Sequence, residues 1–555
     1  MSDSRSLLSS SAVMAAGTVV SRLSGFVRGL MLVAALGAGL HADVFNIANT
    51  VPNMLYILLA GGVVNAVLVP QLVRAMKNEP DGGEAYTNRI ITLAGLFLGV
   101  VTVLLVLGAP WLMRLFLADQ FFTPGCRDQL ESVIDFARYC LPQVFFYGMF
   151  VLVGQVLNAR GRFGPMMWAP IANNVVSFAI LGVYLLTIGP ARGAEKQGGF
   201  GAHAEALLGL GSTLGIVVQF LVLVPYLRAA GFRFRPRLDV RGSGLGHTLR
   251  LGLWTVLFVI VNQVAYTVVV RLASGGTVGA SGGCGQSTSP GTGYTVYSYS
   301  FLLTMVPHSV ITVSLATAML PLLSRYAAEG DLASVGSAVS STLRSAYALV
   351  VPVAVLYSVM SLELAQVIWG YGSGAADYGN FAPTLALFGP ALVLFTAHYL
   401  VLRGFYALEQ NRRVFFIQCA IALTNIVAAV LLVRGADPAQ TAPRLVLAYA
   451  CSYGIGALTS YLLLAREVGG LGARRLLRFL LRLAIAVGLS AVAALGLREL
   501  LDAVVPGSGK VHALVDLALV GVLYLGLYLV LARLLRLTEV TDVMKLVTRR
   551  LRSGS

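Results

Sequence analysis

Long apolar segments follow one another along the whole chain, separated by short clusters of charged residues, glycine and proline. A helix that crosses the hydrocarbon core of a membrane needs about 20 mostly apolar residues. The pattern predicts an all-α integral membrane protein with about 14 transmembrane helices. Their expected positions are residues 9–36, 43–75, 87–117, 131–158, 164–189, 203–229, 244–273, 294–325, 334–367, 379–408, 411–435, 441–466, 473–500 and 511–537.

Composition supports this prediction and excludes a soluble enzyme with a single anchor. Of the 555 residues, 57% are hydrophobic and only 12% are charged, whereas soluble domains have about 25% charged residues. The polar connections are too short to fold as a separate domain. The first ten residues carry no small-residue cleavage site, so we expect no cleavable signal peptide.

Basic residues gather on alternate connections, which predicts the orientation of the chain. The net charge is +16. The connections after the sixth and twelfth predicted helices are rich in arginine, and the C-terminal tail is also basic. Residues 274–293 and 368–378, in contrast, contain no Lys or Arg. Because basic loops remain inside, both termini should be cytoplasmic. In a membrane protein this charge attracts anionic lipid, so we do not expect nucleic acid as a partner.

A weak internal repeat predicts two lobes in parallel orientation. The segment "VPNMLYILLAGGVVNAVLVPQL" begins at Val51 and "VPHSVITVSLATAMLPLL" begins at Val306. Asn174 and Asn425 have a similar separation. Two six-helix lobes plus a C-terminal helix pair fit these offsets. The expected parts are residues 1–230, 231–470 and 471–537, followed by a basic cytoplasmic tail at 538–555.

Two arginines interrupt the first predicted helix. Placing an arginine at mid-bilayer costs about 2.5–3.5 kcal/mol on insertion scales. Arg22 and Arg28 are six residues apart, so a straight helix turns them about 240° away from each other. A bend at Ser24 and Gly25 would bring them together. Planar guanidinium groups suit phosphate or pyrophosphate; the alternative is a structural or snorkelling role.

Other polar residues within the predicted helices are weaker candidates. Asp43 is interpreted either as an outer-gate partner of Arg28 or as an ordinary helix-start residue. Asn53, after Pro52, could orient an arginine or satisfy a freed carbonyl. Asn262, Gln263 and Tyr266 could line a cavity or form interhelical hydrogen bonds. Arg271 fits a snorkelling role near a helix end.

The sequence shows no enzyme signature and no spacing typical of a metal site. We expect no catalytic residues, no metal ligands and no cofactor. Cys126 and Cys284 fall in predicted outer loops, where a bridge or two free thiols are both open. If they paired, we would expect the bond to tether the two halves.

The chain resembles the MurJ/MviN family of lipid II flippases, part of the multidrug/oligosaccharidyl-lipid/polysaccharide exporter superfamily. The resemblance rests on "SRLSGFVRG", "ADVFNIANTVPN", "VLNARGRFGPMMWAPIANN" and "VPHSVITVSLATAMLPLLS" and covers essentially the whole chain. It implies fourteen helices and movement of undecaprenyl-pyrophosphate-linked disaccharide-pentapeptide to the outer leaflet. It also implies that Arg22 and Arg28 hold the pyrophosphate, with Asp43 as the outer acid.

The chain departs from the family pattern at several positions. Tyr56 and Ile57 match a site where many members have an arginine, and Leu302 matches another. Tyr56 or Arg271 could replace these arginines as cavity-lining residues. Gln410 matches a carboxylate that binds sodium in some members.

The sequence therefore predicts a lipid II flippase of the bacterial plasma membrane that works by alternating access. Coupling to the membrane potential or to a cation remains open. Lipid II and anionic lipid are the expected partners, with cell-wall synthesis or division proteins as further candidates. The alternatives are a flippase for another polyprenyl-linked glycan, a related multidrug exporter, a polyprenyl-phosphate glycosyltransferase or a non-transporting scaffold. Arg22 and Arg28 disfavour an exporter of cations, and the loops lack the acids that a transferase needs.

Overall fold

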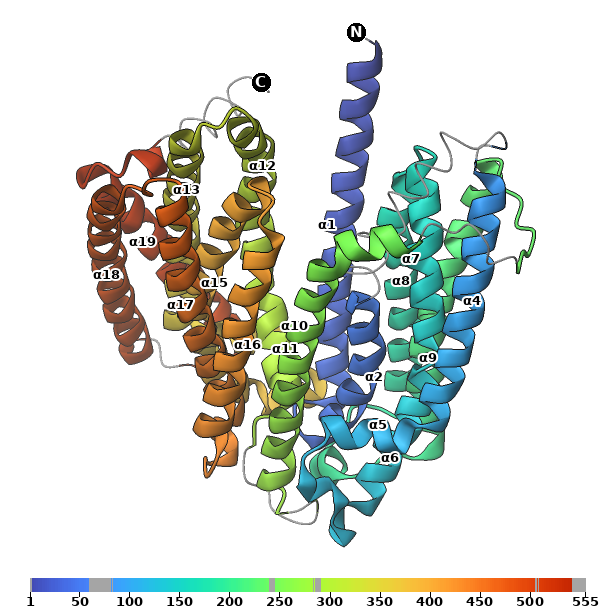
Figure 1. Cartoon of the computed structure of the whole chain (residues 1–555). Coiled ribbons are helices and arrows are strands. Elements are labelled where there is room, and N and C mark those ends of the chain that lie inside the picture. Colours follow the sequence, from blue (N-terminus) through green and yellow to red (C-terminus); the bar gives the residue numbers. More distant parts are fainter. Residues whose placement is uncertain are drawn as a thin grey trace. The chain divides into compact units, whose positions relative to one another are not determined.

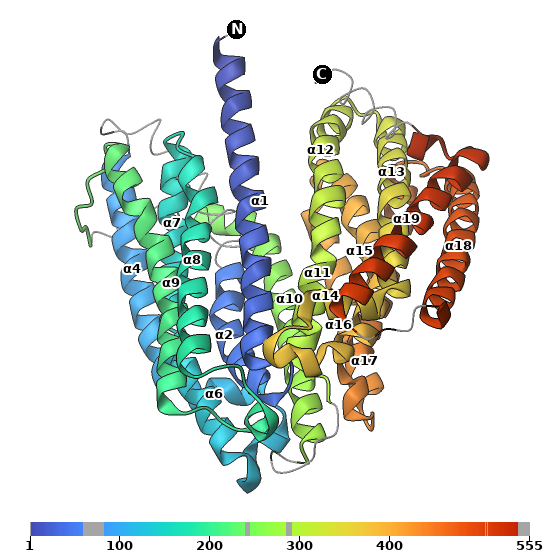
Figure 2. The same cartoon turned by 180° about the vertical axis from the view of Figure 1, so that it is seen from behind.

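A computed structural model describes residues 2–58, 81, 83–238, 245–282, 284, 291–504, 507 and 509–541. The described part of the chain contains helices and no strands (Figures 1 and 2). Thirteen of its helical segments are long and apolar enough to cross a membrane. They match thirteen of the fourteen predicted helices. The remaining one, predicted at 43–75, is described only over α2 (Leu40–Leu58), and residues 59–75 lie outside the described residues.

The chain divides into two compact units. The first comprises Met1–Thr295 with Tyr371–Gly374, and the second comprises Val296–Gly370 with Ala375–Ser555. The helix α10 therefore belongs with the first unit, although the sequence division at residue 230 assigns it to the second lobe. The division into two repeated six-helix lobes remains a prediction. Most of the predicted basic tail lies beyond residue 541, outside the described residues.

The first unit is a bundle whose helices stand side by side in both views (Figures 1 and 2). Short helices lie at the end opposite the N-terminus of α1. The helices are α1 (Ser2–Leu36), α2, α4 (Glu84–Leu107), α5 (Ala109–Phe116), α6 (Arg127–Cys140), α7 (Gln143–Ala159), α8 (Gly164–Thr187), α9 (Ala202–Ala229) and α10 (Leu245–Ala280).

The second unit packs α13, α15, α16 and α17 together and adds the neighbouring pair α18 and α19. A five-residue π-helical segment at His308–Thr312 separates α11 from α12. The helices are α11 (Tyr294–Pro307), whose first two residues belong to the first unit, α12 (Val313–Ala328), α13 (Leu332–Val359), α14 (Ser361–Trp369), α15 (Phe381–Ala407), α16 (Asn411–Val433), α17 (Thr441–Glu467), α18 (Ala473–Val504) and α19 (Lys510–Leu534).

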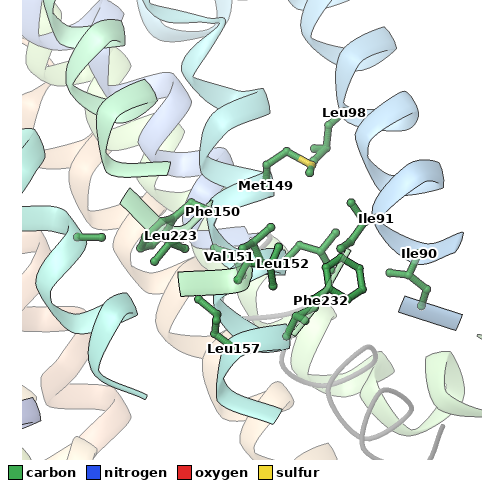
Figure 3. Close-up of a cluster of buried hydrophobic side chains, with 14 of the residues drawn as sticks. Ile90, Ile91, Leu98, Met149, Phe150, Val151, Leu152, Leu157, Leu223 and Phe232 are labelled. Carbon is green, nitrogen blue, oxygen red and sulfur yellow. The ribbon is translucent and has the colours of Figure 1, made fainter. Parts of the chain in front are cut away.

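A hydrophobic cluster joins α4, α7 and α9 in the first unit (Figure 3). Leu98 packs so closely on α7 that a Cβ at Gly148 would be 2.5 Å from its side chain. The opposite face of α4 is apolar too, with Leu96 60% exposed and Phe97 63% exposed. Such a face is suited to lipid tails rather than water.

The basic segment after α9 runs along α4. The backbone N–H of Arg235 donates to Asn88 Oδ1 at 2.7 Å, and that of Arg237 donates to Thr92 Oγ1 at 3.1 Å. These bonds fix the backbone of this connection at the end of the bundle. Arg241, which the sequence assigns to the same connection, lies outside the described residues.

Candidate functional site

Both arginines of the opening helix lie on α1, which runs without a break from Ser2 to Leu36. Arg22 is exposed and Arg28 is half-buried. Their different environments follow from the 240° expected for a continuous helix. The helical conformation also continues through Ser24 and Gly25.

Ser24 and Gly25 form a contact between α1 and α8. Asn174 Nδ2 donates to the Ser21 carbonyl at 3.1 Å and to Ser24 Oγ at 2.7 Å. A Cβ at Gly25 would lie only 3.7 Å from Asn174 Nδ2. The "SRLSG" motif and the "PIANN" motif, which are far apart in the sequence, therefore meet. This contact holds the segment between Arg22 and Arg28 against the bundle.

Arg28 lies within electrostatic reach of Tyr147 on α7. The ring of Tyr147 packs against that of Tyr56 on α2, with ring centroids 4.7 Å apart. No carboxylate of the described residues forms an ion pair with Arg28. Three different helices, α1, α2 and α7, therefore supply one guanidinium and two tyrosines to the same region of the first unit.

The positions of Tyr56 and Tyr147 depend on the hydrophobic core and on α2. Tyr56 packs against the buried cluster of α4, α7 and α9. Asn53 is exposed and precedes Tyr56 by three residues, so the two lie on one side of α2. Pro52, in contrast, is buried inside the helix. The role of Asn53 in substrate binding stays a prediction.

Asp43 is completely buried at the start of α2. Its Oδ2 accepts from Thr277 Oγ1 at 2.8 Å and from the Tyr294 backbone N–H at 3.1 Å, and its Oδ1 accepts from the Thr295 backbone N–H at 2.7 Å. The first N–H groups of a helix have no partner within that helix. Asp43 thus caps α11 from another helix, and its contacts join α2 to α10 and α11 rather than to Arg28.

A second set of hydrogen bonds continues along the same face of α2. Asn46 Nδ2 donates to Thr295 Oγ1 at 2.9 Å, and Thr50 Oγ1 donates to the Tyr294 hydroxyl at 2.6 Å. The Tyr294 hydroxyl also pairs with that of Tyr266 at 2.8 Å. Tyr266 therefore takes part in interhelical hydrogen bonding, one of the two roles that its sequence position allowed.

Glycine is required at position 293 for this arrangement. A Cβ there would lie 1.9 Å from Asp43 Oδ2. Real Cβ atoms do not approach other atoms this closely, so any other residue would displace the carboxylate. The sequence "GTGYT" thereby permits the buried cap.

The remaining candidates on α10 differ in their surroundings. Asn262 is exposed and Gln263 is half-buried. Arg271 pairs with Asp119 at 2.7 Å and also donates to the Arg114 carbonyl. Its guanidinium is thus engaged at the end of the unit that carries α5. Whether any of the three lines a substrate cavity stays a prediction.

Cys126 and Cys284 form a disulfide, with their Cα atoms 5.0 Å apart. The expectation that this bond tethers two halves is wrong, because both cysteines belong to the first unit. The bond instead fastens the end of α10 to the start of α6. Gln129 Nε2 also donates to the Cys284 carbonyl at 3.4 Å.

Sequence reasoning missed Tyr147, Thr277, Tyr294, Thr295 and Gly293 as members of these clusters. Their partners lie up to about 250 residues away, and single apolar helices carry no signal for such pairs. The "GTG" sequence directly before a helix was the one available signal. A helix that starts directly after a glycine, here Gly293, has no side chain at that position to accept from its first N–H groups, so the acceptor must come from elsewhere.

Solved structures with a similar fold are transporters. A structure titled lipid II flippase MurJ, inward closed conformation, matches with a TM-score of 0.70 and 14% identity, covering 94% of this chain and 99% of that one. An inward-facing multidrug resistance MATE family transporter of the MOP superfamily matches with a TM-score of 0.62 and 15% identity, covering 81% and 94%. At these identities the likeness shows the fold.

Sequence comparison distinguishes between the MurJ and the MATE transporters. A protein of Haemophilus influenzae named probable lipid II flippase MurJ is 25% identical over 64% of this chain and 67% of its own length. One of Vibrio cholerae with the same name is 29% identical over 58% of this chain and 57% of its own length. Residues 32–513 match the family described as lipid II flippase MurJ. The chain, a multi-pass membrane protein, belongs to the lipid II flippase MurJ family.

Proposed function

We propose that this protein moves lipid II, the undecaprenyl-pyrophosphate-linked disaccharide-pentapeptide, from the inner to the outer leaflet of the bacterial plasma membrane. It does so by alternating access, in which the headgroup site opens to one side at a time. The observation that carries the proposal is Arg28, which is half-buried, has no carboxylate partner among the described residues and lies within electrostatic reach of Tyr147, which in turn packs against Tyr56.

The chemistry of this cluster fits a pyrophosphate. A guanidinium group offers charge together with directed N–H donors, and each tyrosine adds a hydroxyl donor. By its resemblance to the family, the chain has Tyr56 and Ile57 where many members carry an arginine, and Tyr56 supplies the polar group at this place. Arg22 contributes further positive charge on the same helix, and Asn53 a polar side chain close to Tyr56. Asp43 acts as a gate residue through its hold on the start of α11.

The proposed orientation places both termini in the cytoplasm. An inside-negative potential then favours outward movement of an anion by about 2.3 kcal/mol per charge per 100 mV. Coupling to this potential or to a cation would supply the driving force without a bound cofactor. Anionic lipid is attracted by the basic connections, and proteins of cell-wall synthesis or division are further partners to be tested.

Two alternatives fit less well. An exporter of cationic drugs would need a negative site, whereas the cluster around Arg28 is positive. An enzyme would need catalytic acids in its connections, and the family is one of flippases. A flippase for another polyprenyl-pyrophosphate glycan uses the same anion chemistry, and substrate competition distinguishes it.

The test combines depletion of the native protein with an assay for lipid II exposed on the outer leaflet. Cells then express Arg22→Ala, Arg28→Ala or the corresponding Lys variants, with membrane abundance measured in parallel. We expect both Ala variants to accumulate normally and to stop flipping, and both Lys variants to keep part of the activity. Arg325→Ala is the control. Arg325 is exposed, and its ion pair with Glu329 is long, at 3.9 Å. Normal transport by both Ala variants at normal abundance would refute the proposal.

A further inference from the structure

We propose that Asp502, His512 and Asp516 form a binding site for a divalent metal ion between α18 and α19. His512 Nε2 lies 3.2 Å from Asp516 Oδ2 and 3.9 Å from Asp502 Oδ1. The three possible ligand atoms all lie within 4.8 Å of one another. His512 and Asp516 are one turn apart on α19, and Asp502 comes from the last turn of α18.

The contacts within this group are not those of a completed hydrogen-bond network. His512 Nε2 is fully enclosed yet makes no hydrogen bond with any described residue, although Asp516 Oδ2 is close to it. The Asp516 side chain is only 6% exposed. A nearly buried carboxylate normally has a hydrogen-bonded or charged partner. His512 Nε2 and Asp516 Oδ2 thus lie at ion-pair distance without the alignment of a hydrogen bond, an arrangement in which both atoms can bind one ion.

The separations fit metal coordination. Zinc binds imidazole nitrogen and carboxylate oxygen at about 2.0–2.2 Å, so two ligands of a tetrahedral ion lie about 3.4 Å apart. The distances of 3.2 Å and 3.9 Å from His512 Nε2 lie on either side of this value. A small movement of the exposed Asp502 side chain would bring the third ligand into place.

The neighbouring arginine does not neutralise these acids. Arg498 precedes Asp502 by four residues, the spacing of a helical ion pair. Its guanidinium instead pairs with Glu363 on α14 at 2.6 Å. Asp502 therefore contacts His512 instead of Arg498. The carboxylates of Asp502 and Asp516 both lie close to the single imidazole of His512.

The ligand set selects the class of ion. Calcium and magnesium prefer sites made of oxygen ligands, whereas an imidazole with two carboxylates suits Zn²⁺ or a similar transition-metal ion. Asp502 is 61% exposed, so water can complete the coordination. Such an ion would hold the end of α18 to the start of α19, a role separate from transport. The sequence search missed the group because its members are spread over two helices.

Zn²⁺ binding to the purified full-length protein tests the site. Isothermal titration should show one Zn²⁺ bound by the native chain. Asp502→Asn, His512→Gln and Asp516→Asn should each weaken binding by about tenfold or more. His203→Gln is the matched control, because His203 is an exposed histidine near the start of α9. The three free cysteines remain in every variant, so thiol binding cannot produce the expected difference.

A second measurement separates loss of the metal site from misfolding of the variants. A chelator should lower the thermal midpoint of the zinc-loaded native protein and of His203→Gln, but leave that of His512→Gln unchanged. Asp502→Asn alters only an exposed side chain, so its loss of affinity cannot be attributed to unfolding. Equal Zn²⁺ affinity in the native protein, Asp502→Asn and His512→Gln would overturn the proposal, as would an absence of binding to the native chain.

Discussion

The backbone N–H of Thr295 donates to Asp43 Oδ1 at 2.7 Å, although the two residues are 252 positions apart in the sequence. The backbone N–H groups of Tyr294 and Thr295 at the start of α11 thus donate to a buried carboxylate from α2. A negative charge at this end of a helix is also favoured by the helix dipole. The first turn of α11 is where the chain leaves the first unit, so Asp43 holds this exit point.

We predict that Asp43→Ala destabilises the first unit by about 2 kcal/mol, because it removes a helix cap and leaves buried donors unsatisfied. Gly293→Ala should have a similar effect by displacing the carboxylate. Asp135→Ala, which removes an exposed acid paired with Arg138, serves as the control. Thermal unfolding in detergent measures the three variants. An Asp43→Ala midpoint equal to that of the control would contradict the capping role.

The tyrosine pair offers a test of the anion site that leaves its charge intact. Tyr147→Phe and Tyr56→Phe each remove one hydroxyl donor while keeping the ring. We expect each to lower the rate of flipping by about tenfold or more, since a hydrogen bond to a charged group is worth about 1.5–3 kcal/mol. Tyr461→Phe, which changes a tyrosine in the second unit, provides the comparison. Outer-leaflet lipid II accessibility is the readout, and unchanged rates in both variants would remove the tyrosines from the site.

His41 predicts a dependence of stability on pH. This residue precedes the predicted second transmembrane helix, stacks on Phe200 and has its Nδ1 3.1 Å from the Gly198 carbonyl. Burial lowers the pKa of His41 to about 4, from 6.5. The unfolded chain therefore takes up a proton between about pH 6.5 and pH 4 that the folded chain does not.

Folded stability should accordingly fall by about 2 kcal/mol between pH 7.5 and pH 5 on account of this residue. His41→Asn should flatten this part of the profile of thermal midpoint against pH, whereas His203→Asn should not. A profile for His41→Asn that still parallels the native one would show that another group causes the acid sensitivity.

Because the disulfide lies within the first unit, we predict that it stabilises this unit and is not required for transport. Cys126→Ser and Cys284→Ser should lower the stability of the first unit by about 2–5 kcal/mol. Flipping should persist at temperatures below the new midpoint, because the bond lies within one unit. Reductant should reproduce both effects in the native protein and have no further effect on the variants. Transport that stops on oxidation and restarts on reduction would argue against this assignment.

The sequence predicted the helices well and the contacts between them poorly. Continuous apolar segments with charged ends specify membrane helices almost by length alone, and the structure describes thirteen of them. Arg22 and Arg28 stood out because charge is rare in such segments. Tyr147, Thr277 and Thr295 did not, because a single hydroxyl or backbone N–H in an apolar helix has no distinctive pattern. Their importance follows from residues that meet only after folding.

Domain boundaries illustrate the same limit. The repeat suggested a division at residue 230, but the bonds of Asp43 and the Cys126–Cys284 bridge attach α10 and the start of α11 to the first unit. These are long-range contacts between polar groups at helix ends. Hydropathy reports where helices begin and end, and says nothing about which neighbour they join.

The bond between Cys126 and Cys284 also imposes an order on biosynthesis. It cannot close until the ribosome has supplied the chain through α10, since 158 residues separate its ends. At that moment most of the second unit has still to be made. The first unit can therefore be covalently locked in its folded form while translation of the second unit continues, and the supply of oxidant to these two thiols sets how early in synthesis that locking occurs.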